Sequence, residues 1–297
     1  MNTTVLVRSE SMPSDAEAIS DTDTTRRSWS GDLGAFVLFL GHPRSGTTLL
    51  ANLLDAHPQI IVAYQHDAVG KIESGLESEE LYRQILANSR EHAAIDQQTN
   101  GYTYRIPGCW QGRYKNLKVI GDKKAAAVTE QLSQNPHLTD RIRDRVGIPL
   151  RVIQVVRNPF DNIATMTRKT KQLGGELSNG VQHYFKLAQG AHRVRSQLKT
   201  NELILVRHEQ LVADTHNVLG SICGRLGVQP TMDYLDACSS IVFPSAKKTR
   251  NSVRWPAKLI REVEEQIASD QLLAGYAFEE KPASDVTESQ FVESDFV

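Results

Sequence analysis

The sequence predicts an α/β fold: a single doubly wound domain with a central parallel sheet and a P-loop-like strand–loop–helix. Three observations support this prediction. Short apolar runs alternate with helical patterns along most of the 297 residues. The first apolar run leads into two glycines that bracket four residues, and a helical pattern starts directly after them. A later apolar run ends in Arg-Asn-Pro, which is typical of a helix start.

The composition limits the possible partners and compartments. With 34 basic and 35 acidic residues the formal net charge is −1, so we expect no nucleic-acid partner. The three cysteines, Cys109, Cys223 and Cys238, lack metal-ligand spacing, so we expect no metal site and a reducing, cytoplasmic location. No apolar run approaches the roughly 18 residues needed to span a bilayer, so we expect no membrane association. The sequence does not specify an oligomeric state.

The two ends of the chain differ from its middle. Residues 1–31 are rich in Ser, Thr and Asp and contain no apolar segment, which predicts a disordered N-terminal segment and neither a signal nor a transit peptide. Residues 279–297 predict an acidic, flexible tail. We therefore expect the folded domain to span residues 32–278.

The first strand and its loop form the most informative stretch. Residues 36–40 are all apolar, as in a strand buried on both faces, and residues 47–54 read as a helix. Between them, Gly41 and Gly46 allow a tight turn whose backbone N–H groups point at an anion. The spacing matches the nucleotide-binding P-loop, except that Thr47 stands where the lysine belongs. The nearest cation is Arg44, inside the loop, so the site suits a phosphate-like anion and not ordinary ATP chemistry.

Two further strands are predicted to end near this loop. Residues 60–63 lead into Tyr64-Gln65-His66-Asp67, and the strand that starts at residue 118 ends in Lys123-Lys124. Ligands of open α/β sheets bind beyond the carboxyl ends of the strands, so we expect these side chains beside the loop. Between the two strands, residues 78–95 read as a helix and residues 101–114 as an irregular, aromatic-rich segment. Its rings could contact an acceptor or hold the segment against the core.

A second anion site is predicted after the strand at residues 152–156. Arg157 stands at the strand end, Asn158 has the position of an N-cap and Pro159 that of the first helical residue. Thr165 lies on the same face of that helix as Asn158. A strand-end arginine and a nearby hydroxyl can bind a phosphate. Together with the glycine-bracketed loop, they indicate a ligand that is anionic at two separate points.

The remaining chain continues the alternation. Helical patterns are predicted at residues 136–145, at 177–199, up to 225 and at 256–268, and a strand at residues 203–206. Glu209, just after that strand, is expected to have a structural role near a helix start. Residues 244–255 carry four cations with interleaved Ser, Thr and Asn, which fits either a solvated basic loop or a phosphate contact.

Both motifs resemble those of a known family. Gly-His-Pro-Arg-Ser-Gly-Thr-Thr-Leu-Leu at 41–50 resembles the 5′-phosphosulfate loop of PAPS-dependent sulfotransferases. Val-Val-Arg-Asn-Pro-Phe-Asp-Asn-Ile-Ala-Thr at 155–165 resembles their 3′-phosphate-binding element, and Asp-Ala-His-Pro at 55–58 is similar to bacterial and protein-tyrosine sulfotransferases. The resemblance covers about residues 35–270, strongly at the two motifs and diffusely between them.

The resemblance implies transfer of a sulfuryl group from PAPS to a hydroxyl or amine, with release of PAP and no metal. The acceptor could be a small molecule, a sugar or a peptide. Arg44 and Lys123 would stabilise charge at the transferring group. The implied cofactor-binding residues are Arg44, Ser45, Gly46, Thr47, Thr48, Arg157 and Thr165, with Lys247, Arg250 and Arg254 added through the looser similarity of the basic loop.

The general base departs from the family pattern. Tyrosine sulfotransferases have a catalytic glutamate after the His-Pro segment, and Gln65 stands at the aligned position. His66 is the first candidate because histidine titrates near neutral pH, Asp67 is the second, and a group elsewhere is a third alternative. Two other functions remain open at this stage. One is a degenerate P-loop kinase or NTPase, disfavoured by the missing lysine; the other is a non-catalytic nucleotide-binding protein of the same fold.

Overall fold

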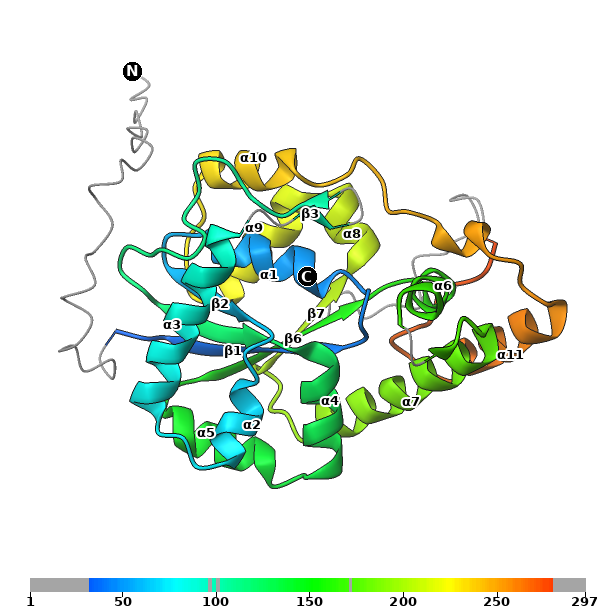
Figure 1. Cartoon of the computed structure of the whole chain (residues 1–297), viewed down its shortest axis with the longest axis horizontal. Helices are drawn as coiled ribbons and strands as arrows, with labels where there is room; N and C mark the ends of the chain where they lie inside the picture. The colour runs from blue at the N-terminus through cyan, green and yellow to red at the C-terminus, as the bar shows by residue number, and fades with distance from the viewer. Residues whose placement is uncertain (1–31, 96–97, 100–101, 171–172, 280–297) are drawn as a thin grey trace, which may run out of the picture.

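The computed structural model describes residues 32–95, 98–99, 102–170 and 173–279. The predicted N-terminal segment and nearly all of the acidic tail lie outside these residues. Within them, one parallel sheet has five strands in the order β2-β5-β1-β6-β7 (Figure 1). The strands are β1 (Ala35–Gly41), β2 (Ile60–Tyr64), β5 (Val119–Lys123), β6 (Leu150–Val156) and β7 (Leu203–Arg207). The predicted α/β fold with a central parallel sheet is confirmed.

Helices connect the strands and continue after the last one. Their bounds are α1 (Thr47–Asp55), α2 (Ala68–Glu73), α3 (Ser78–Ala94), α4 (Ala125–Gln134), α5 (Leu138–Val146), α6 (Pro159–Lys169), α7 (Leu177–Arg195), α8 (His208–Ala213), α9 (Thr215–Arg225), α10 (Met232–Ser240) and α11 (Ala257–Ala268). A 3₁₀ turn, η3 (Thr249–Ser252), lies in the basic segment, and β3 (Gln98–Thr99) pairs with β4 (Tyr102–Thr103) in an antiparallel ladder.

Three of these helices were not predicted, and each lacks the signal that the predictions used. α2 is only six residues long, too short for a helical period to show. α4 begins with three alanines, which give little contrast between its faces. α10 is nine residues long and buries only Tyr234, Leu235 and Cys238, so its apolar stripe is short.

The sheet has a hydrophobic layer on each face, which makes the fold doubly wound. On one face Val37 and Phe39 pack with α1, α9 and α10. On the other face Phe36 and Leu38 pack with α2, α3, α4 and α5. Figure 1 shows α1, α9 and α10 above the sheet and α2, α4 and α5 below it. Burial on both faces explains why β1 is apolar throughout instead of alternating.

A third apolar cluster joins α6, α7 and α11 beside the sheet, around the buried Phe160, Tyr184 and Val263. It supports the helix that follows β6. Because β1 lies between β5 and β6 and all three strands are parallel, the loops that follow them lie side by side at the carboxyl ends of the strands. The strands on one side of β1 are β5 and β2, and those on the other side are β6 and β7. Ligands of open α/β folds bind where the strand order changes direction in this way.

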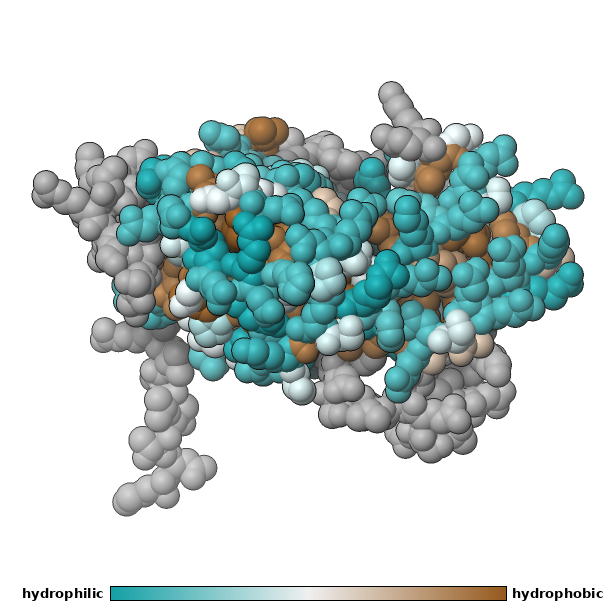
Figure 2. All heavy atoms as spheres, turned by 90° about the horizontal axis from the view of Figure 1, so that it is seen from below, coloured by the Kyte–Doolittle hydropathy of each residue, from teal (hydrophilic) through white to brown (hydrophobic). Residues whose placement is uncertain are grey.

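The outer surface is mixed. None of the helices in the described part of the chain is long and apolar enough to cross a membrane. Polar and charged side chains cover most of the described face in Figure 2, with smaller apolar areas between them. Among large apolar side chains of the described residues, Ile95 and Met232 are the exposed ones.

Candidate functional site

The loop between β1 and α1 is held by three residues in the left-handed region of backbone space. Gly41 has φ 117°, Arg44 has φ 68° and Gly46 has φ 105°. Gly46 is also needed for clearance, because a Cβ atom there would lie 2.4 Å from Nδ1 of His208, the first residue of α8. The first N–H groups of α1 have no acceptor within the helix. They and the helix dipole therefore leave an anion site at the loop.

His42 fixes this loop without adding charge to it. Its ring is buried, stacks on Tyr184 of α7 at a centroid distance of 3.9 Å, and its Nε2 donates to the Tyr184 carbonyl at 2.9 Å. Burial lowers the pKa of His42 to about 4, so the ring is neutral at pH 7. The Ser45 hydroxyl closes the turn by donating to the His42 carbonyl at 2.9 Å.

Lys123, at the end of β5, is the cation that reaches the start of α1. Its Nζ donates to Oγ1 of Thr48 at 2.9 Å and lies 3.9 Å from the centre of the Tyr64 ring. The side chain is buried. Burial lowers the pKa of Lys123 to about 7; Asp122 opposes this shift and the charge of Arg44 adds to it. The structure thus brings Lys123, Thr48 and Arg44 together, as the sequence predicted.

Asp122 holds the turn that follows β2. Its carboxylate accepts hydrogen bonds from the backbone N–H groups of His66 and Ala68, both at 3.0 Å. The turn contains two non-glycine residues with positive φ, Gln65 at 55° and Asp67 at 66°, a backbone conformation that is uncommon for residues other than glycine. Gln65 also donates its N–H to the Lys123 carbonyl at 3.2 Å. This bond holds the Gln65 backbone beside the strand end that carries Lys123, and the Gln65 side chain is exposed.

The two candidate bases lie on this turn, but their side chains engage neighbouring helices. The His66 ring hydrogen-bonds to the Gln84 side chain of α3, and burial and the nearby Lys71 lower its pKa. Its Nε2 is buried and has no hydrogen-bond partner among the described residues. Asp67 forms an ion pair with Lys124 at 3.1 Å. Among the described residues, no hydrogen bond or ion pair joins either side chain to Arg44 or Lys123.

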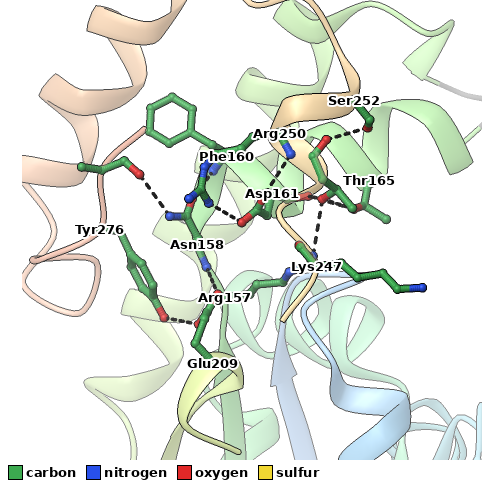
Figure 3. A network of polar contacts seen from close by, with 12 residues as sticks. Arg157, Asn158, Phe160, Asp161, Thr165, Glu209, Lys247, Arg250, Ser252 and Tyr276 are labelled. Atoms are coloured by element: carbon green, nitrogen blue, oxygen red, sulfur yellow. Dashed lines mark hydrogen bonds and ion pairs between the residues drawn. The ribbon is translucent and has the colours of Figure 1, made fainter. Parts of the chain in front are cut away.

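The second anion site is built around Arg157, at the end of β6. Its buried guanidinium donates to the carbonyl of Lys247 at 2.7 Å (Figure 3). It also donates to the carbonyl of Arg44 at 3.2 Å and lies 3.4 Å from Oγ1 of Thr249. Arg157 therefore connects the first loop to the basic segment late in the chain. Asn158 caps α6 as predicted, because its side chain accepts the N–H of Phe160 at 3.0 Å.

We call residues 245–252 the strap. It lies along α6 and is held there by Asp161 (Figure 3). The Arg250 guanidinium forms a buried ion pair with the Asp161 carboxylate, and the Arg250 N–H donates to the same carboxylate at 2.8 Å. The Thr249 hydroxyl donates to the Asp161 carbonyl at 2.8 Å and lies 2.9 Å from the Thr165 hydroxyl. The strap thus adds Thr249 to the Arg157 and Thr165 pair.

The predicted cations of this segment have different environments. Arg250 is buried and fixes the strap through its ion pair. Lys247 is exposed, with Nζ 4.2 Å from the centre of the Phe243 ring, and Arg254 is exposed beyond the strap. Lys247 and Arg254 can therefore reach a ligand from solvent, whereas Arg250 acts through the position of Thr249.

Two neighbours of these sites come from the strand end at β7. His208 is buried between Gly46 and Arg157, and within the described residues its Nδ1 has no hydrogen-bond partner. Burial and the charge of Arg157 lower the pKa of His208 to about 3, so it is neutral. Glu209 accepts the N–H of Asn158 at 2.9 Å and has the predicted structural role. Sequence reasoning missed His208, although its place directly after a strand was a usable signal.

The aromatic segment is docked on the core through Asp55. This buried carboxylate accepts hydrogen bonds from the N–H groups of Gly112 at 2.9 Å and Val62 at 2.8 Å and from the Ser89 hydroxyl at 2.8 Å. Burial raises the pKa of Asp55 to about 6. Tyr104, in the same segment, lies near enough to Tyr64 and Arg44 for both to affect its pKa, which burial raises. The segment is therefore pinned to the core and also borders the loop.

Comparison with known proteins gives one family. A model described as the sulfotransferase family matches residues 37–233. A sulfotransferase domain of the olefin synthase from Synechococcus PCC 7002 is similar at 18% identity and a TM-score of 0.49, over 80% of this chain and 94% of that one. A sulfotransferase from Alicyclobacillus acidocaldarius has 16% identity and a TM-score of 0.47, over 83% and 96%. Mouse sulfotransferase SULT7A1, solved with PAP, has 11% identity and a TM-score of 0.43, over 80% and 83%. No curated protein matches the chain.

Proposed function

Because the chain belongs to the sulfotransferase family, we propose that it transfers the sulfuryl group of PAPS to a hydroxyl or amine of an acceptor and releases PAP. The observation that carries this proposal is the link between two anion sites. Arg157 bonds to the carbonyl of Arg44 in the first loop and to that of Lys247 in the strap. One rigid arrangement can therefore hold a nucleotide that is anionic at both ends.

The donor groups fit such a nucleotide. On the 5′ side, the open N–H groups of α1 would hold the phosphosulfate together with Thr48 and Lys123. On the other side, Arg157, Thr165 and Thr249 would hold the 3′-phosphate, with Lys247 and Arg254 adding charge from solvent. His208 lies between the first loop and Arg157, and within the described residues its buried Nδ1 has no hydrogen-bond partner. A buried polar atom without a partner suits a site that a ligand completes.

PAPS supplies an activated sulfuryl group, and the role of the chain is to stabilise the charge that develops when this group moves. Arg44 is exposed in the loop, and Lys123 is held by the Thr48 hydroxyl and the Tyr64 ring. Both cations would bind oxygens at the transferring group. One such preorganised donor is typically worth about 3–4 kcal/mol in the transition state.

Calorimetry with PAP, PAPS and ATP–magnesium would test the proposed function. We expect PAP and PAPS to bind in the presence of EDTA and ATP–magnesium to bind weakly, because the loop lacks the lysine that holds a β,γ-phosphate pair. Labelled PAPS with an acceptor mixture should then give labelled product. ATP–magnesium binding without PAP binding would instead support a kinase or NTPase. PAP binding with no transfer to any acceptor would support a non-catalytic protein.

PAP binding should also depend on pH through Lys123. The pKa of Lys123 is lowered to about 7 in the free protein, so at about pH 8 most of the amine is neutral. A bound anion favours the ammonium form and raises this pKa. Binding at about pH 8 should therefore take up close to one proton, and PAP affinity should fall as the pH rises above about 7.

Calorimetry in buffers of different ionisation enthalpy measures this proton uptake. In Lys123→Met the uptake at about pH 8 should largely disappear, whereas Lys71→Met, on α2, should retain it. Zero uptake by the unmodified protein would contradict the placement of Lys123 at the phosphosulfate.

A further inference from the structure

A hydroxyl acceptor loses its proton during sulfuryl transfer, and the carboxylates around this site are already engaged. Among the described residues, each accepts hydrogen bonds or pairs with a cation: Asp122 binds backbone N–H groups of the 66–68 turn, Asp67 pairs with Lys124, Asp161 pairs with Arg250, Asp55 binds the aromatic segment, and Glu209 binds the N–H of Asn158. The His66 ring contacts Gln84 on α3 through a hydrogen bond, and its Nε2 is buried, with no hydrogen-bond partner among the described residues and no exposure to an acceptor. The chain therefore offers few groups to remove a proton from a weakly acidic hydroxyl.

The residue held beside Lys123 cannot act as a base. Gln65 has a strained backbone conformation, with φ 55°, and donates its N–H to the Lys123 carbonyl. Its exposed carboxamide can donate and accept hydrogen bonds, but it does not take up a proton at neutral pH. The backbone bond places Gln65 next to the strand end that carries Lys123, with its side chain open to solvent. The group there is suited to orient an acceptor oxygen.

The same place is cationic and lined by aromatic rings. Lys123 packs on the face of Tyr64, whose ring stacks on His92 at a centroid distance of 4.0 Å. Tyr64 and Arg44 both affect the pKa of Tyr104, which burial raises. Two cations stabilise an oxyanion and repel an ammonium group, and the rings favour a flat, apolar acceptor body.

From these observations we propose that the acceptor is a phenol, which reaches the site as a phenolate stabilised by Lys123 and Arg44 and oriented by Gln65. This inference rests on the proposed sulfotransferase function. The phenol first gives its proton to solvent. The phenolate oxygen then forms a bond to sulfur, and the bond between sulfur and the bridging oxygen breaks with its electron pair left on PAP. The products are an aryl sulfate, PAP and one proton.

The chemistry distinguishes phenols from other hydroxyl acceptors. A phenol has a pKa of about 10, whereas an aliphatic hydroxyl resembles water, about six pKa units higher. Without a base, an aliphatic hydroxyl stays protonated even beside two cations. A primary alkylamine is an ammonium ion at neutral pH and is repelled by the same cations.

The first experiment compares matched acceptors on the unmodified protein with PAPS. The pairs are phenol with cyclohexanol and 4-ethylphenol with 4-ethylcyclohexanol. We expect kcat/KM for each phenol to exceed that of its saturated partner by at least about 10²-fold. Equal rates, or a preference for the saturated partner, would overturn the proposal.

A spectroscopic titration tests phenolate binding without turnover. A chromogenic nitrophenol is bound to the protein in the presence of PAP, and the visible absorbance of its phenolate is followed against pH. We expect the apparent pKa of the bound nitrophenol to fall by about one unit or more relative to the free compound. Lys123→Met should remove most of this shift and Lys71→Met should leave it. An unshifted or raised pKa in the unmodified protein would overturn the proposal.

Gln65→Glu tests the position of the acceptor. A carboxylate there supplies the missing base, so we expect turnover of cyclohexanol to rise at least about tenfold and turnover of phenol to rise less than about threefold. Equal effects on both acceptors would place the acceptor oxygen away from Gln65 and contradict the proposal. PAP binding is measured on the same samples. If PAP binds and saturated acceptors are preferred, the phenol inference fails alone; if PAP does not bind, the sulfotransferase function fails first.

Discussion

Replacement of Arg44 by alanine should lower turnover by about 10²- to 10³-fold and change the Kd for PAP by less than about threefold. The side chain of Arg44 is exposed in the loop, and only its backbone carbonyl bonds to Arg157. Alanine keeps that carbonyl. Because neither residue is glycine, the positive φ of 68° is similarly strained in both. Loss of the guanidinium should therefore affect mainly the charge that develops during transfer.

Two measurements separate these effects. Transfer from labelled PAPS gives kcat, and calorimetry with PAP gives the Kd. Arg141→Ala is a matched control, because this arginine is exposed on α5 and, within the described part of the chain, donates only to the Glu73 carbonyl. A parallel loss of turnover and PAP binding in Arg44→Ala would show that Arg44 holds the ground-state nucleotide, contrary to the role proposed here.

Replacement of Arg157 by alanine should have the opposite balance and weaken PAP binding by about 10²-fold or more. The variant loses a charged donor at the 3′-phosphate and leaves the carbonyls of Arg44 and Lys247 without this partner. A hydrogen bond from a charged donor typically contributes about 1.5–3 kcal/mol, so the thermal midpoint should also fall. Arg157→Lys should recover only part of the affinity, because an ammonium cannot reproduce the planar, forked geometry.

Calorimetry with PAP, together with hydrogen exchange of the strap, measures both consequences. Exchange should increase in residues 245–252, since one of their attachments is removed. Arg151→Ala is the control on the same strand, at the end far from the site. PAP affinity within about threefold of the unmodified protein would exclude Arg157 from the phosphate site.

The parts of the fold that are determined by residues close together in the sequence could be predicted. The β1 loop and α1 follow from the spacing of Gly41 and Gly46, and the start of α6 follows from Asn158 and Pro159. Both motifs contain their own turn chemistry, so no distant contact was needed to locate them.

The contacts that could not be predicted join residues that are far apart in the sequence. Asp161 lies within a recognised motif, but its partner Arg250 is 89 residues away, so nothing local indicated an ion pair. Asp122 resembled an ordinary strand-end acid until the fold placed it under the 66–68 turn. The contact of His208 with Gly46 likewise exists only because β7 and β1 lie on opposite sides of β6. Periodicity and spacing carry no information about such pairs.

The ion pair between Asp161 and Arg250 has a consequence for the order in which the protein matures. During synthesis, the first loop and Arg157 leave the ribosome well before the strap and Arg254, which are the last parts of the nucleotide site to be made. A nascent chain that ends before residue 245 contains both phosphate motifs but lacks Thr249 and the carbonyl of Lys247. Such a chain should be unable to hold PAP firmly. The nucleotide can therefore stabilise the finished fold, but it cannot serve as a template for its early stages.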